Sequence, residues 1–205
     1  MTEQTLNTRP APQRHVLLAL ILVAVTQAAV LVGEWLIAHY PLWTGTELRL
    51  KVQPVDPRDL FRGNYVRLGY HFSTLPMDLG KTVFEKGDVV YVSLRPDEEN
   101  GWTAQGIHGS APEATPFLRA RVMRVYHGHY DVFRGFDDDN NPVREQVSTR
   151  GAYELRYGIE AWFAPKLKAQ GIERDLRDGG WVTVKVAESG RAALVELEVG
   201  KASDE

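Results

Sequence analysis

Ser73 is the first serine of the chain and the first side chain to consider as a nucleophile. Membrane-tethered Ser/Lys peptidases use a serine near the membrane surface and a lysine with a lowered pKa as its base. Lys81 and Lys86 follow too closely in the sequence to be clear bases, and nothing indicates that Lys166 or Lys168 is desolvated. A membrane-tethered, Ser/Lys peptidase-like hydrolase is therefore an alternative and not our main interpretation.

Oxygen ligands for a divalent cation occur along the acidic segment Asp137-Asp138-Asp139-Asn140-Asn141-Pro142. A complete EF-hand loop also needs glycine at its sixth position and glutamate at its twelfth, where this chain has Pro142 and Ser148. The segment fits either a solvated acidic turn or a weak divalent-cation site.

His127, His129 and Asp131 alternate, so an uninterrupted strand would place them on one face, as a zinc site requires. Gly128, between two histidines, favours a bend or a hairpin tip instead. The sequence shows no third and fourth ligand beside them. We therefore predict no metal site here, no catalytic residue and no cofactor.

Composition excludes several functional classes. The absence of cysteine excludes disulfide scaffolds, iron–sulfur clusters and thiol catalysis. A net charge of −3 without a basic run argues against a nucleic-acid partner. The 205 residues have room for one domain with an appendage, and they indicate no particular biochemical activity.

An apolar segment near the N-terminus is the strongest physical signal. Residues 16–38 contain one charged side chain, Glu34, and form a helix of roughly 34 Å, enough for a hydrocarbon core of about 30 Å. Arg9 and Arg14 precede the segment, so the positive-inside rule places the N-terminus in the cytoplasm. A cleaved signal peptide and a buried helix fit less well, because the segment is long and apolar on every face.

We expect this segment to be a single transmembrane helix that contacts the lipid bilayer, with the following domain periplasmic or otherwise extracytoplasmic. The chain then divides into a disordered cytoplasmic tail at 1–15, the helix at 16–38, a short linker at 39–45, a β-rich domain at 46–200 and a tail at 201–205.

The domain has a pattern of period two, which is typical of strands. It predicts strands at Glu47–Gln53, Tyr65–Phe72, Asp88–Leu94, Trp102–Gln105, Phe117–Tyr126, Tyr130–Arg134, Ala152–Phe163, Trp181–Val186 and Ala193–Glu198. A short amphipathic helix is expected at Pro165–Leu176. The fold class is mainly β: one antiparallel β-sandwich or small barrel-like domain with a short helix, after the transmembrane helix.

Glycine precedes three of these strands, at Gly63, Gly87 and Gly180. Glycine adopts left-handed backbone conformations readily, so we expect a tight turn before each strand. The last two strands are predicted to form a hairpin around Ser189-Gly190.

The segment from Pro54 to Tyr70 resembles the bacterial GDYXXLXY family, named for its Gly-Asp-Tyr-x-x-Leu-x-Tyr signature. The matching residues are Gly63, Tyr65, Leu68 and Tyr70, while Asn64 replaces the aspartate. The later segment Tyr157–Pro165 is also similar to that family. The resemblance implies a membrane-anchored bacterial protein of unknown activity, often encoded near multi-pass membrane proteins.

Alternation along the signature strand places Leu68 and Tyr70 in the core and Tyr65 and Arg67 on the opposite face. The signature residues are therefore structural or partner-binding. We expect a protein of the bacterial inner membrane that acts as a non-enzymatic accessory module for a multi-pass membrane protein. Its oligomeric state is left open.

Overall fold

Alternating apolar residues build the sheets of this protein. The computed structural model describes residues 14–54, 65–113, 116–136, 142–148, 150–176 and 179–199. In strand β1 (Thr46–Pro54), Leu48, Leu50 and Val52 are buried, whereas Glu47, before them, and Arg49, between the two leucines, are exposed. This alternation gives the strand one core face and one solvent face.

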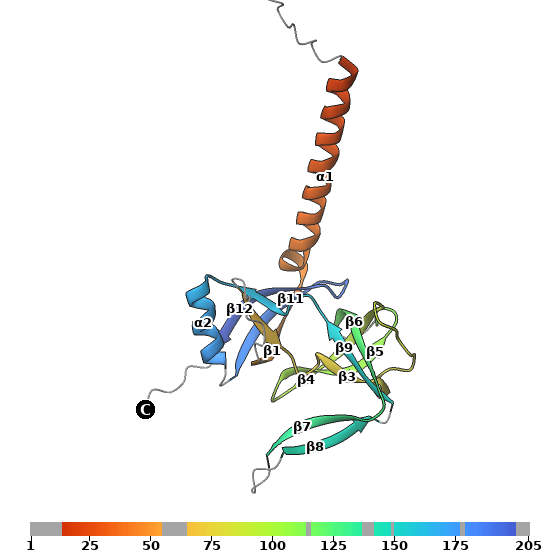
Figure 1. Ribbon diagram of the computed structural model, residues 1–205, viewed down its shortest axis with the longest axis vertical. Helices are drawn as coiled ribbons and strands as arrows, with labels where there is room; N and C mark the ends of the chain where they lie inside the picture. The colour runs from red at the N-terminus through yellow and green to blue at the C-terminus, as the bar shows by residue number, and fades with distance from the viewer. Residues whose placement is uncertain are drawn as a thin grey trace, which may run out of the picture. The chain divides into compact units, whose positions relative to one another are not determined.

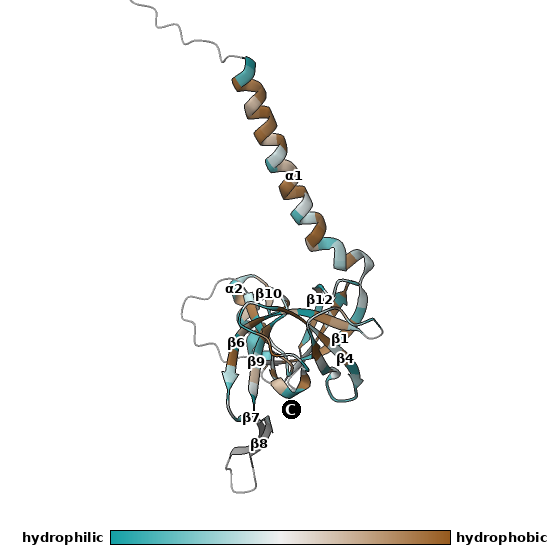
Figure 2. Ribbon diagram, turned by 90° about the vertical axis from the view of Figure 1, so that its right-hand side faces the viewer, coloured by the Kyte–Doolittle hydropathy of each residue, from teal (hydrophilic) through white to brown (hydrophobic). Residues whose placement is uncertain are grey.

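Two five-stranded antiparallel sheets form a half-barrel around a common apolar core (Figures 1 and 2). The first sheet has the order β10 (Ala161–Phe163), β2 (Tyr65–Gly69), β1, β11 (Gly180–Val186), β12 (Ala192–Val199). The second has the order β3 (Thr74–Pro76), β9 (Gly151–Arg156), β6 (Phe117–His127), β4 (Val89–Asp97), β5 (Gly101–His108). Strands β7 (Tyr130–Phe136) and β8 (Pro142–Ser148) form a separate hairpin.

The predicted fold class is confirmed: the protein is mainly β, with antiparallel sheets after one long apolar helix. The predicted short helix is α2 (Lys166–Asp175), which buries Ala169. The predicted hairpin is β11–β12, with Gly190 at φ +76°. A 3₁₀ turn, η1 (Met77–Leu79), and the short strands β3 and β8 were not predicted.

The predicted strand Ala152–Phe163 is wrong as one element, because it is divided into β9 and β10, which belong to different sheets. Gly158 has φ +89°, a conformation that ends an extended run. The carboxylate of Glu160 accepts hydrogen bonds from the amides of Tyr157 and Gly158, at 2.5 and 2.9 Å, and holds the chain in this turn. The same segment therefore carries the chain from one sheet to the other.

The glycine turns are only partly as expected. Gly87 has φ +101°, as predicted, but before β11 the positive φ of +88° belongs to Gly179 and not to Gly180. Gly180 serves close packing, because an added Cβ would lie 2.7 Å from Leu176 Cδ2 and 2.8 Å from the Glu198 carbonyl oxygen. Gly63 lies outside the described residues.

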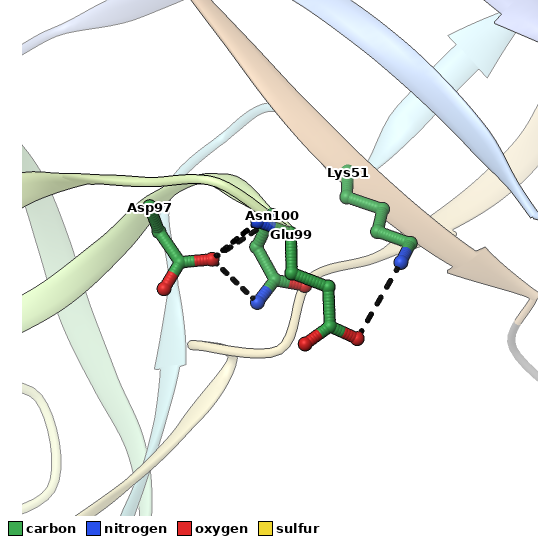
Figure 3. A network of polar contacts seen from close by, with 4 residues as sticks. All are labelled: Lys51, Asp97, Glu99 and Asn100. Carbon is green, nitrogen blue, oxygen red and sulfur yellow. Dashed lines mark hydrogen bonds and ion pairs between the residues drawn. The ribbon is translucent and has the colours of Figure 1, made fainter.

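The turn between β4 and β5 packs against β1 and joins the two sheets (Figure 3). Asp97 Oδ1 accepts hydrogen bonds from the amides of Glu99 and Asn100 and from Asn100 Nδ2, at 2.8 to 3.1 Å. The Asn100 carbonyl accepts from the Lys51 amide at 3.1 Å, and Lys51 Nζ lies 3.9 Å from Glu99 Oε1. These contacts fix the register of one sheet against the other.

Helix α1 (Arg14–Thr44) is long and apolar enough to cross a membrane, and hydrophobic residues recur along much of its length (Figure 2). The chain divides into two units after His39, and we call residues 40–205 the β unit. Residues 39–45, expected as a linker, are helical as far as Thr44. Within the β unit, Pro41 is buried and Lys185 Nζ donates to the Leu42 carbonyl at 3.3 Å.

Candidate functional site

Strand β2 carries the second half of the signature. Leu68 is 1% exposed and Tyr70, just after the strand, is 4% exposed, so the predicted core positions are confirmed. Tyr65 is half-buried and Arg67 is exposed on the other face, as alternation predicted. Gly63 and Asn64 lie outside the described residues.

Two buried tyrosines join the signature to the β9–β10 connection. Tyr70 Oη donates to the Ile159 carbonyl at 2.7 Å, and Tyr157 Oη donates in return to the Phe72 carbonyl at 2.8 Å. The Phe72 ring stacks on Tyr70, with centroids 5.4 Å apart, and meets Tyr157 edge to face. Burial, assisted by the charge of Glu160, raises the pKa of both tyrosines, so both remain neutral donors at ordinary pH.

This reciprocal bonding brings together two segments about ninety residues apart in the chain. Both were singled out in the sequence, but nothing there indicated that they touch. The Leu68 amide also donates to the Glu160 carbonyl, at 2.9 Å. The signature therefore closes the corner at which the chain passes between the sheets.

A groove of about 650 Å³ opens beside this corner, between β2, β9 and β10. Its lining includes Tyr65, Arg67, Ser73, Glu154, Arg156 and Phe163. The rings of Tyr65 and Phe163 lie with their centroids 6.0 Å apart. Phe163 is 78% exposed, and Leu167, in the first turn of α2, is 84% exposed. These are the most exposed large apolar side chains among the described residues, and we call Tyr65, Phe163 and Leu167 the aromatic face.

Ser73 lies in the turn that follows Tyr70 and lines the same groove. Its hydroxyl accepts a hydrogen bond from the Tyr70 amide at 3.2 Å, and its carbonyl accepts from the Leu155 amide at 2.8 Å. Within the described ranges, no lysine is hydrogen-bonded to Ser73. The geometry thus gives this serine a turn-closing role.

A second serine was not recognised in the sequence. Ser93 Oγ lies 3.0 Å from His108 Nε2, and an added Cβ on Gly106 would meet both side chains at 3.1 to 3.3 Å. Gly106, which is paired with Ser93, leaves room for the imidazole of His108 on β5 to reach Ser93 on β4. Ser93 is 5% exposed, and no carboxylate of the described chain is hydrogen-bonded to His108. A serine–histidine pair needs an orienting group for efficient nucleophilic catalysis. The pair could not be recognised in the sequence, because its two residues are 15 positions apart.

His71 lies near the junction of the sheets. Its Nε2 is 3.0 Å from Thr103 Oγ1, whereas its Nδ1 is buried without a hydrogen-bond partner. Burial lowers the pKa of His71; the charges of Asp97 and Glu99 oppose this shift, and Lys51 adds to it. The neutral imidazole is therefore the form that fits this position.

The metal candidates give no cluster within the described residues: no three histidine, aspartate or glutamate side chains there gather as ligands. Gly128 has φ +93° and lies between β6 and β7, so the predicted bend between His127 and His129 is confirmed. The acidic positions 137–141 lie outside the described residues, and Pro142 begins β8.

The comparisons with known proteins find the same family that the signature residues resemble. A family model described as GDYXXLXY protein matches residues 27–197, from within α1 to β12. No curated protein and no solved structure matches the chain.

Proposed function

The chain belongs to the GDYXXLXY protein family, and from this premise we propose that it is a membrane-anchored accessory module that binds a multi-pass membrane protein. The module is non-enzymatic, and its partner contacts the aromatic face. The protein resides in the bacterial inner membrane with the β unit on the periplasmic side.

The proposed orientation is supported by the charges that flank α1. Arg9 and Arg14 precede its apolar part, and Glu34 lies near its far end. Positive charge is retained on the cytoplasmic side of a membrane helix. The β unit begins at Tyr40, directly after the apolar residues, so a partner in the same bilayer is always close to it.

The aromatic face is the observation that carries the proposal. A soluble domain gains free energy by burying large apolar side chains, yet Phe163 and Leu167 remain 78% and 84% exposed, four residues apart. Large apolar and aromatic side chains that remain exposed are typical of protein interfaces. Tyr65 extends this surface to the groove through its contact with Phe163.

The proposal is tested by purifying the affinity-tagged full chain from detergent-solubilised membranes. We expect one multi-pass membrane protein to co-purify, and the F163S/L167S double variant to retain at most about a tenth of it, as loss of interface anchors predicts. Val83→Ser is the matched control, because Val83 is also exposed, at 72%. Equal recovery with the double variant and the control would contradict the proposal.

The hydrolase alternative makes a different prediction. If Ser73 or Ser93 were a nucleophile, Ser73→Ala or Ser93→Ala would abolish the protein's function in cells while the amount of folded protein stayed normal. The accessory function predicts that both variants support normal growth. Failure of either single variant to support normal growth would favour a hydrolase.

A further inference from the structure

Two arginines face each other across neighbouring strands. Arg121 of β6 and Arg156 of β9 are directly paired in the antiparallel register, and both are exposed. Directly opposed residues have Cβ atoms about 5 Å apart, and like charges at this separation destabilise a sheet. A bound anion would offset this repulsion.

The surrounding side chains do not supply that anion. Arg121 Nη1 donates to the Gly87 carbonyl at 2.8 Å, and no carboxylate of the described residues is paired with Arg156. Glu154, beside Arg156 in the lining of the groove, is already engaged by Tyr126 Oη at 2.8 Å and by Arg124 at 3.4 Å. The carboxylate of Glu160 is likewise occupied by backbone amides.

More positive charge lies on the same surface. Arg156 lines both the groove and a second hollow of about 450 Å³, which Lys86 and Arg124 also line, and Arg67 lines the groove. Arg67 and Lys86 are exposed and have no ion pair with any described carboxylate. The two hollows are lined by four cations, Arg67, Lys86, Arg124 and Arg156, and by two carboxylates, Glu154 and Glu160. We call these four cations, together with Arg121, which is paired with Arg156, the cationic track.

We propose that the cationic track binds the phosphate of an anionic lipid head group, with Arg67 and Arg156 as its principal contacts. The guanidinium fork matches the geometry of phosphate oxygens and forms strong charge-assisted hydrogen bonds with them. A lipid is favoured over a free phosphate because the β unit begins directly after a helix that is long and apolar enough to cross a membrane. Such a tether keeps lipid head groups at high effective concentration.

This inference rests on the proposed membrane anchoring, but it does not depend on the proposed partner protein. Arg67 and Arg156 share the groove with Tyr65 and Phe163, but lipid binding is assigned to the arginines and partner binding to the aromatic face. The two can fail separately, because one predicts loss of a lipid and the other loss of a protein.

The test measures thermal unfolding of the full chain in non-ionic detergent micelles, followed by tryptophan fluorescence. The probes are short-chain phosphatidylglycerol, phosphatidylcholine with the same chains, inorganic phosphate, and a glutamate-rich peptide. We expect phosphatidylglycerol alone to raise the unfolding midpoint, by about 3 °C at saturating mole fraction, and high salt to reduce this shift. The R67Q/R156Q variant should lose the shift, and Arg95→Gln, an exposed arginine on β4, should keep it.

Several results would overturn the proposal. Equal midpoint shifts with phosphatidylcholine would mean that binding does not depend on the charge of the lipid. An unchanged shift in R67Q/R156Q would mean that the lipid binds elsewhere. A shift as large with inorganic phosphate would assign the track to a soluble anion. A shift with the acidic peptide and none with phosphatidylglycerol would assign it to a protein. Because the two arginines are exposed, the unliganded midpoint of R67Q/R156Q should equal or exceed that of the wild type.

Discussion

Among single residues, the two tyrosines of the signature, Tyr65 and Tyr70, differ in their burial. Tyr70 is 4% exposed and bonded to the Ile159 carbonyl, whereas Tyr65 is half-buried beside Phe163. Tyr70→Ala should lower the free energy of unfolding by about 3 to 5 kcal/mol, because it empties a buried aromatic site. Tyr65→Ala should lower it by less than about 1 kcal/mol.

Urea unfolding of the full chain in detergent measures both changes. Tyr70→Phe keeps the ring and removes the hydroxyl, and should cost about 1 to 3 kcal/mol because the Ile159 carbonyl loses its buried donor. If Tyr65→Ala were as destabilising as Tyr70→Ala, both tyrosines would be structural, and Tyr65 would no longer support the aromatic face.

His71 makes stability depend on pH. Its folded pKa is lowered by burial, and an unfolded histidine has a pKa of about 6.5. Below that pH the unfolded chain binds a proton that the folded chain resists, so the free energy of unfolding falls as the pH drops. The wild type should therefore lose more stability between about pH 7.5 and pH 5 than His71→Gln does. Parallel pH profiles of the urea midpoint would contradict this role for His71.

For the elements, the contact between the β4–β5 turn and β1 depends on Gly101. This glycine has φ +73°, and an added Cβ would lie 2.1 Å from the Arg49 carbonyl oxygen. Gly101→Ala should cost more than about 2 kcal/mol, since it combines backbone strain with a clash against main chain. Gly171→Ala, in α2 with nothing within 4 Å of the added Cβ, should instead stabilise the protein by about 0.5 to 1 kcal/mol. Similar urea midpoints for the two variants would disprove the close contact.

Elements with strong alternation could be predicted from the sequence, and those defined by tertiary contacts could not. β1 and β11 have regular apolar alternation and lie where expected, within two residues. β3 has three residues, too few for a period, and the break between β9 and β10 depends on Gly158 and on the hydrogen bond that the Glu160 carboxylate accepts from the Tyr157 amide. Alternation cannot reveal a positive φ inside an apolar run.

The candidate site was predictable only in part for a related reason. The burial of Tyr70 follows from the parity of one strand, which the sequence shows directly. The aromatic face combines residues of β2, β10 and α2, and the Arg121–Arg156 pair combines residues of β6 and β9, so the Tyr65–Phe163 and Arg121–Arg156 pairings depend on strand register. Register is a tertiary property that one sequence does not specify locally.

For the whole molecule, the proposed orientation predicts an extracytoplasmic β unit. An alkaline-phosphatase-type reporter fused after Glu205 should be active, and a fluorescent reporter that folds only in the cytoplasm should be dark at the same position. Because the chain has no cysteine, Val83→Cys gives an independent probe: a membrane-impermeant maleimide should label it in spheroplasts without lysis. Labelling only after lysis would reverse the orientation.

The central claim is that the aromatic face contacts a membrane protein, and site-specific photo-crosslinking in intact cells tests it most directly. A photoreactive phenylalanine analogue is placed at Phe163 and, as control, at Val83, both of which are exposed. The account predicts one adduct with a multi-pass membrane protein from position 163 and none from position 83. The same adducts from both positions, or no membrane-protein adduct from position 163, would contradict it.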